Sequence, residues 1–154
     1  MRPMPELVTA DASGLILLQK IGELDLLQRL YDTIVTTPVV AAEYGLPLPP
    51  WIKLEAAADV ALQELLAAQV DMGEGSAIAL ALERPGCILI LDDYKARKLA
   101  ERLELSLTGT FDLLLRAKWQ GLIPAVKPLL ERIKQTNFRF SAAVELEILK
   151  QAGE

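Results

Sequence analysis

Residues 87–93 read Cys-Ile-Leu-Ile-Leu-Asp-Asp, and the predicted fold class follows from them. Its unbroken apolar run is typical of a strand that is covered on both faces, as the strands of parallel sheets are. Shorter apolar runs elsewhere in the chain predict further strands near residues 7–10, 33–36, 51–54 and 105–108. The run at 87–91 therefore predicts a buried strand within a parallel sheet.

Helical spacing of apolar residues fills the segments between these strands. The predicted helices cover residues 15–21, 24–30, 37–44, 59–68, 71–82, 94–103, 111–120, 125–135 and 141–151. Because strands and helices alternate along the chain, we expect an α/β fold, a three-layer α/β/α sandwich with a central parallel sheet. No repeat or long linker divides the 154 residues, which predicts a single domain over 1–154, with a core at about 7–130 and C-terminal helices at 125–151.

The composition excludes several classes of enzyme. The chain has no histidine and one cysteine, Cys87, which excludes serine and cysteine triads, the common zinc sites and internal disulfides. A lone cysteine and no charged-then-apolar leader predict a cytoplasmic protein. The longest uncharged stretches, such as Thr33–Ala42, fall far short of the ~18 residues that a spanning helix needs, so we expect no membrane span.

The net charge of −5 is unevenly distributed. Residues 1–94 hold 5 basic and 14 acidic side chains, whereas residues 95–154 hold 11 basic and 7 acidic ones. This division is consistent with a metal site beside a phosphate-binding rim, or with two ordinary solvated faces. The basic side chains available to phosphate are Lys95, Arg97, Lys98 and Arg102 on one predicted helix, or Arg116 and Lys118 further along.

Acidic residues follow the predicted strands. Asp11 follows the first strand, and the pair Asp92 and Asp93 follows the aliphatic one. Glu43 lies in the helix after the second strand, and Glu74 lies at the start of the most apolar helix. Because ligands of such sheets bind at the carboxyl ends of the strands, we expect these acids to converge at one edge.

Each acid also has a purely structural interpretation. Asp11 and Asp93 can cap the helices that follow them. Asp71 and Glu74 have the spacing of a capping box, which requires no function. Glu43 shares a helix face with apolar residues, but a helix of two turns can leave it exposed.

Taken together, the acids predict a cation. Carboxylates that lie close together repel one another, which raises their pKa values, and a bound divalent cation removes this penalty. Ligands that are all oxygen suit Mg²⁺ or Mn²⁺ rather than zinc. Such a site can activate water for attack on a phosphodiester, which gives hydrolysis without histidine.

Several segments, taken in order, resemble a known family. They are Val8-Thr-Ala-Asp-Ala-Ser-Gly-Leu-Ile16, Thr37-Pro-Val-Val-Ala-Ala-Glu43, Gly73-Glu-Gly-Ser-Ala-Ile-Ala-Leu-Ala81, Leu89-Ile-Leu-Asp-Asp93 and Leu107-Thr-Gly-Thr110. Their order and spacing over about residues 7–130 resemble the PIN-domain superfamily, in particular its prokaryotic VapC-like toxin-nuclease branch.

The resemblance implies a Mg²⁺- or Mn²⁺-dependent endoribonuclease, often the toxin of a toxin–antitoxin pair. It implies an RNA substrate, an antitoxin protein partner and a homodimer. The catalytic acids would be Asp11, Glu43, Glu74 and one or both of Asp92 and Asp93, and all of these except Glu43 would be the metal ligands. Ser13 would support Asp11, while Lys95, Arg97 and Lys98 would bind the RNA backbone.

Two hydroxyl residues, Thr108 and Thr110, stand at the end of the last predicted strand. They can support the acidic site, or Thr110 can simply cap the next helix.

Glu74 departs from the family pattern, since many members carry aspartate at that position.

Two other functions stay open. The first is a non-catalytic PIN-like module that binds RNA or protein. The second is a small-molecule phosphohydrolase, which usually has an Asp-x-Asp pair after the first strand; here the second position after Asp11 is Ser13.

Overall fold

The computed structural model describes residues 7–154. Within this part of the chain, five strands form one sheet in which all neighbours are parallel. The strands are β1 (Leu7–Ala10), β2 (Thr33–Thr36), β3 (Ile52–Leu54), β4 (Ile88–Ile90) and β5 (Ser106–Thr108). Their order is β3-β2-β1-β4-β5, so the sheet grows outward from β1 in both directions. Such a reversal of strand order opens a crevice at the carboxyl ends of the strands on either side of it, here β1 and β4.

Helices connect successive strands. Helices α1 (Ala12–Lys20) and α2 (Leu26–Leu30) join β1 to β2, and α3 (Pro38–Tyr44) follows β2. Helices α4 (Val60–Ala67) and α5 (Met72–Leu82) precede β4, and α6 (Tyr94–Arg102) precedes β5. The chain continues through α7 (Thr110–Trp119), α8 (Lys127–Lys134) and α9 (Ala142–Gln151).

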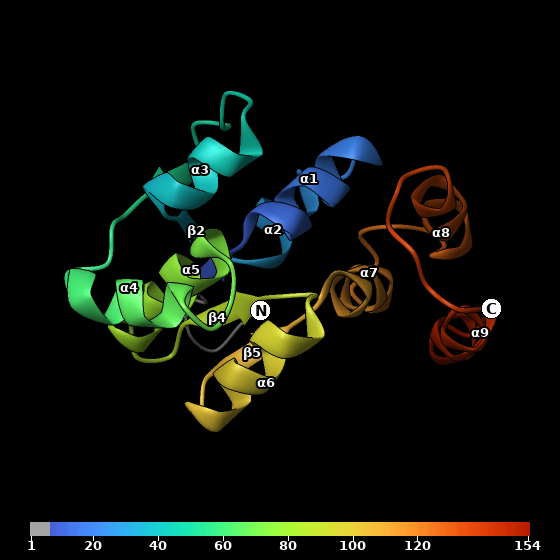
Figure 1. The fold of residues 1–154 in the computed structure, drawn as a ribbon. Helices are drawn as coiled ribbons and strands as arrows, with labels where there is room; N and C mark the ends of the chain where they lie inside the picture. The colour runs from blue at the N-terminus through green and yellow to red at the C-terminus, as the bar shows by residue number, and fades with distance from the viewer. Residues whose placement is uncertain (1–6) are drawn as a thin grey trace.

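Two apolar layers cover the two faces of the sheet. On one face, Leu89 and Leu91 pack with the small buried residues of α5 and α6. On the other face, Ile90 and Val8 pack with α1, α2 and α7, and Figure 1 shows α1 and α2 across the sheet from α6. Because the side chains of a strand alternate between its faces, the aliphatic run supplies both layers. The predicted α/β/α sandwich with a parallel sheet is thereby confirmed.

The register of β1 and β4 sets the position of the residues that follow them. Ala10 pairs with Ile90, so the two strands end at the same level. The Asp11 N–H donates to the Ile90 carbonyl at 3.3 Å, and the Leu91 N–H donates to the Thr108 carbonyl at 3.0 Å. The acids after β1 and β4 therefore begin side by side.

The cysteine and the lengths of the helices agree with the sequence-based expectations. Cys87 is buried and its Sγ lies 3.2 Å from the Thr9 hydroxyl, which places it in the core. Over residues 7–154, every helix is too short or too polar to cross a membrane.

Candidate active site

Asp11 is the most buried acid at the carboxyl edge of the sheet. It caps α1, and its carboxylate accepts a hydrogen bond from the Gly14 N–H at 3.1 Å. The residue is only 2% exposed. The pKa of Asp11 is raised to about 8, first by burial and then by the negative charges of Asp92, Glu74 and Asp71, while the hydrogen bond from Gly14 acts in the opposite direction. Asp11 is therefore a buried acid with other carboxylates around it.

Glu74 reaches the same region from the first turn of α5. It forms a capping box with Asp71: the Asp71 carboxylate accepts the Glu74 N–H at 2.7 Å, and the Glu74 carboxylate accepts the Asp71 N–H at 3.2 Å. Glu74 is 7% exposed, and burial raises its pKa to about 7, with Asp71 and Asp93 adding negative charge. The capping interpretation is confirmed, and the pair also contributes to the acidic cluster.

Asp71 belongs to this cluster, although the sequence analysis considered it only as a capping residue. Its charge raises the pKa values of Asp11, Glu43 and Glu74. The signal in the sequence was its place as the N-cap of the helix that carries Glu74, since a residue that begins that helix at the sheet edge must lie near the other acids there.

Asp92 is held in place by Thr110. The Thr110 N–H donates to Asp92 Oδ1 at 2.9 Å, and the Thr110 hydroxyl donates to Oδ2 at 2.6 Å. A Cβ placed on Gly14 would lie 3.3 Å from Asp11 Oδ1 and 4.0 Å from Asp92 Oδ2. The carboxylates of Asp11 and Asp92 therefore flank the first turn of α1.

Asp93 differs from Asp92 in its surroundings. It is exposed, and its carboxylate caps α6 by accepting the Ala96 N–H at 2.9 Å. Its charge acts on Glu74, whereas that of Asp92 acts on Asp11. Three helix N-termini, those of α1, α5 and α6, thus meet the cluster, and each favours a nearby carboxylate.

Glu43 lies at the rim of the cluster. The residue is exposed, and its carboxylate packs against the Cα of Gly73 in the first turn of α5. Burial of the carboxyl group and the charge of Asp71 raise the pKa of Glu43, while a hydrogen bond from the Gly73 backbone lowers it. The charge of Asp71 thus acts on Glu43 as well as on the other acids of the cluster.

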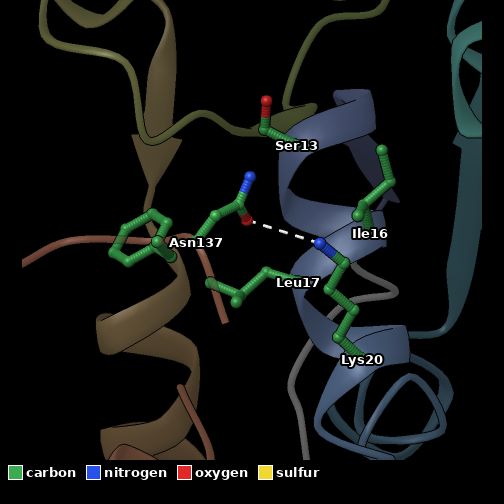
Figure 2. A pocket seen from close by; sticks show the side chains of 6 residues that line it. Ser13, Ile16, Leu17, Lys20 and Asn137 are labelled. Carbon is green, nitrogen blue, oxygen red and sulfur yellow. Dashed lines mark hydrogen bonds between the residues drawn. The ribbon is translucent and has the colours of Figure 1, made fainter. Parts of the chain in front are cut away.

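The hydroxyl residues occupy different places. Thr110 is fully buried beside Asp92, and Thr108 contributes its carbonyl to the Leu91 N–H. Ser13 is exposed and lines a cavity of about 390 Å³ between α1 and residues 137–138. Figure 2 shows Ser13 at one end of this cavity and the bond from Lys20 Nζ to Asn137 Oδ1, 3.3 Å long, toward the other.

The basic residues of α6 point in two directions. Lys95 and Lys98 are exposed and line a cavity together with Arg102. Arg97 points elsewhere, since its Nη1 donates to the Leu91 carbonyl at 2.7 Å. A Cβ placed on Gly109 would lie 3.0 Å from Asp92 Oδ1 and 3.1 Å from Arg97 Nη1, so this guanidinium is close to Asp92.

The donor set has the chemistry that a hard divalent cation requires. All the acidic groups offer oxygen, and those of Asp11 and Glu74 are desolvated beside other carboxylates. No three acids within residues 7–154 stand close enough together to enclose a metal ion. Mg²⁺ takes only one or two direct carboxylates and keeps several waters, so such an enclosure is not required. The residues therefore fit a partly hydrated cation.

A comparison with known protein families agrees with the fold. The model of a family described as a PIN domain, DUF3368, matches residues 7–154, the whole of the described chain. No curated protein and no solved structure matches the chain.

Proposed function

The chain belongs to the PIN-domain family, a group of nuclease-type folds, and on that premise we propose that it is a Mg²⁺- or Mn²⁺-dependent endoribonuclease. The observation that carries the proposal is the burial of Asp11 among other acids. A carboxyl group that is almost fully buried, with three other acids acting on it, is stable as an anion only when a cation joins it.

We assign the acids by their surroundings. Asp11, Glu74, Asp92 and Asp93 would share the cation, one or two of them as direct ligands and the others through its bound waters. Glu43, at the rim beside Gly73, would orient the attacking water or complete the metal shell. A bound divalent cation supplies two effects: it lowers the pKa of water, and it stabilises the charge on the phosphoryl oxygens.

The basic side of the site would hold the RNA. Lys95 and Lys98 are exposed on α6, which begins at the acidic cluster, and they would contact phosphates. Arg97 would add positive potential beside Asp92. Thr110 would keep the Asp92 carboxylate in place. Thr108 would fix the backbone between β4 and Asp92, because its carbonyl accepts the Leu91 N–H. Ser13, which is exposed in the first turn of α1, would support Asp11.

The biological setting is a further part of the proposal. As a member of the VapC-like branch, the protein would be the toxin of a toxin–antitoxin pair in the cytoplasm, working as a homodimer and as a single PIN domain. An antitoxin segment would cover the acidic cleft, with an arginine among the carboxylates, because a guanidinium can satisfy the same charges as the metal.

The experiment compares metal binding with RNA cleavage in matched variants. Mn²⁺ is titrated into the protein by calorimetry, and the same samples are incubated with a mixed RNA pool. Asp11→Asn is expected to weaken Mn²⁺ binding and abolish cleavage. Asp25→Asn is the control, because it removes the same charge from the exposed N-cap of α2, a helix that carries none of the acids of the cluster.

Three results would count against the nuclease. Cleavage that persists in Asp11→Asn would show that Asp11 does not hold a catalytic metal. RNA binding by the wild-type protein without cleavage would favour the non-catalytic module. Hydrolysis of small phosphoesters alone would favour the phosphohydrolase.

A further inference from the structure

A second cavity, of about 360 Å³, lies next to the acidic cluster. One wall is the exposed side of α6, with Tyr94, Lys95, Lys98 and Arg102, and the other is the end of the α4–α5 connection, with Gln69 and Val70. Lys95, Lys98 and Arg102 follow the spacing i, i+3 and i+7, which places them on one face of the helix. The cavity thus carries three positive charges along a single stripe.

Tyr94 is an exposed aromatic residue at the entrance of this stripe. Its side chain is 74% exposed, and Lys98 Nζ lies 5.3 Å from the centre of the ring. Lys98 also has a long ion pair with Glu101, at 3.5 Å, between two half-exposed side chains. Among residues 7–154, Lys95 and Arg102 have neither an ion pair nor a side-chain hydrogen bond. An open aromatic ring and two uncommitted cations are therefore available to a ligand.

Both walls of the cavity lead directly to the acids. Tyr94 follows Asp93, and Val70 precedes Asp71, and both of these acids act on Glu74. A ligand that fills the cavity therefore ends beside the carboxylates. A polyanion needs cations there, because the cluster itself repels phosphate.

We propose that this cavity binds one nucleotide of single-stranded RNA next to the scissile bond, with its base stacked on Tyr94 and its phosphate held by Lys95 and Arg102. The proposal rests on the proposed ribonuclease function and names the form of RNA that it takes. Unpaired bases expose the π-face that an aromatic side chain needs, whereas those of a duplex are stacked on each other. The site therefore selects single strands without reading sequence.

Binding is measured in EDTA, so that the result does not depend on cleavage. A labelled single-stranded oligoribonucleotide is followed by fluorescence anisotropy with the wild-type protein and variants. Tyr94→Ala is expected to bind about fivefold to a hundredfold more weakly, the range for loss of one stacked base. Tyr94→Phe keeps the ring and is expected to bind within about twofold of the wild type. A strand of abasic residues should not distinguish Tyr94→Ala from the wild type.

The cations are tested in the same way. Lys95→Ala and Arg102→Ala should weaken binding and reduce its dependence on salt, because each removes a phosphate contact. Lys127→Ala removes an exposed charge from α8, outside the cavity, and is the matched control. Equal binding of Tyr94→Ala and the wild type, or equal affinity of the wild type for duplex and single strands, would overturn the proposal.

The two proposals fail in different ways. If Tyr94→Ala weakens RNA binding but no metal supports cleavage, the nucleotide site stands and the nuclease does not. If Mn²⁺ supports cleavage but Tyr94→Ala binds normally, the nuclease stands and the nucleotide site does not.

Discussion

Thr110 holds the Asp92 carboxylate through both of its oxygens, with the backbone N–H on Oδ1 and the hydroxyl on Oδ2. The contact links the start of α7 to the turn after β4. It leaves Asp92 in a set orientation beside α1, where its charge acts on Asp11. The interpretation of Thr110 as a helix cap is wrong, because Gly109 is the N-cap of α7. The buried Thr110 hydroxyl instead donates to a carboxylate, and its removal has measurable consequences.

Thr110→Val keeps the backbone donor and the side-chain volume but removes the hydroxyl. Because hydrogen bonds to charged groups contribute about 1.5–3 kcal/mol, we expect a loss of stability of this order together with weaker Mn²⁺ binding. Urea unfolding and calorimetry measure the two effects. Thr110→Ser should retain both properties. Thr108→Val, whose carbonyl bond to Leu91 survives, should cost under about 0.5 kcal/mol; an equal cost at both positions would contradict this account.

Stability without metal should depend on pH because of Asp11 and Glu74. Their folded pKa values, about 8 and about 7, lie above the unfolded values near 4. The folded state thus binds more protons than the unfolded state between these limits. The contribution of these two groups to the free energy of unfolding is fully present below about pH 4, is lost as the pH rises towards 8, and then levels off.

Unfolding in urea at a series of pH values, in EDTA, measures this dependence. Asp11→Asn removes the buried ionisable group, so its stability should fall less with pH and exceed that of the wild type at about pH 9. If the loss of stability with rising pH is no smaller in Asp11→Asn than in the wild-type protein, Asp11 is not the buried acid with a raised pKa that is described here.

Added metal should reverse the penalty at high pH. At a Mn²⁺ concentration of about 100 times Kd, binding to the folded state alone adds about 2.7 kcal/mol of stability. The gain should grow as the pH rises, because the cation displaces the protons held by Asp11 and Glu74. Thermal unfolding with and without Mn²⁺ measures it, and Asp25→Asn should match the wild type. An equal gain in Asp11→Asn would locate the metal elsewhere.

Substitutions at two glycines of α5 should affect different properties: RNA cleavage at Gly73 and stability at Gly75. A Cβ at Gly73 would overlap the carboxylate of Glu43, an exposed side chain that can move away. Gly73→Ala should therefore displace Glu43 and lower cleavage as Glu43→Gln does, with little change in stability. Cleavage assays and urea unfolding test both points, and unchanged cleavage in Gly73→Ala would show that the position of Glu43 does not matter.

Gly75→Ala provides the contrast. Its Cβ would lie 3.0 Å from the backbone nitrogen of Ala67 and 3.3 Å from the carbonyl carbon of Leu66, at the end of α4. Backbone atoms of a packed helix cannot move aside, so we expect a loss of about 1–3 kcal/mol. Urea unfolding that shows no loss would mean that α4 is free to shift away from α5.

Local patterns in the sequence were sufficient for the elements of the fold. The aliphatic run before Asp92 specified a strand covered on both faces, and Thr37-Pro38 specified the start of α3, because both signals depend on neighbouring residues alone. The acids at the strand ends followed from the general rule for parallel sheets. These features could be predicted because the physics behind them is local or common to the whole fold class.

The way in which these side chains meet depends on the tertiary structure. The sequence could not separate Asp92 from Asp93, but the register of β1 and β4 brings Asp92 towards Asp11 and leaves Asp93 capping α6. The sequence also could not show that the side chain of Arg97 points away from Lys95. Each of these outcomes depends on packing between segments that are distant along the chain, and a carboxylate's charge acts through space on whatever the fold places beside it.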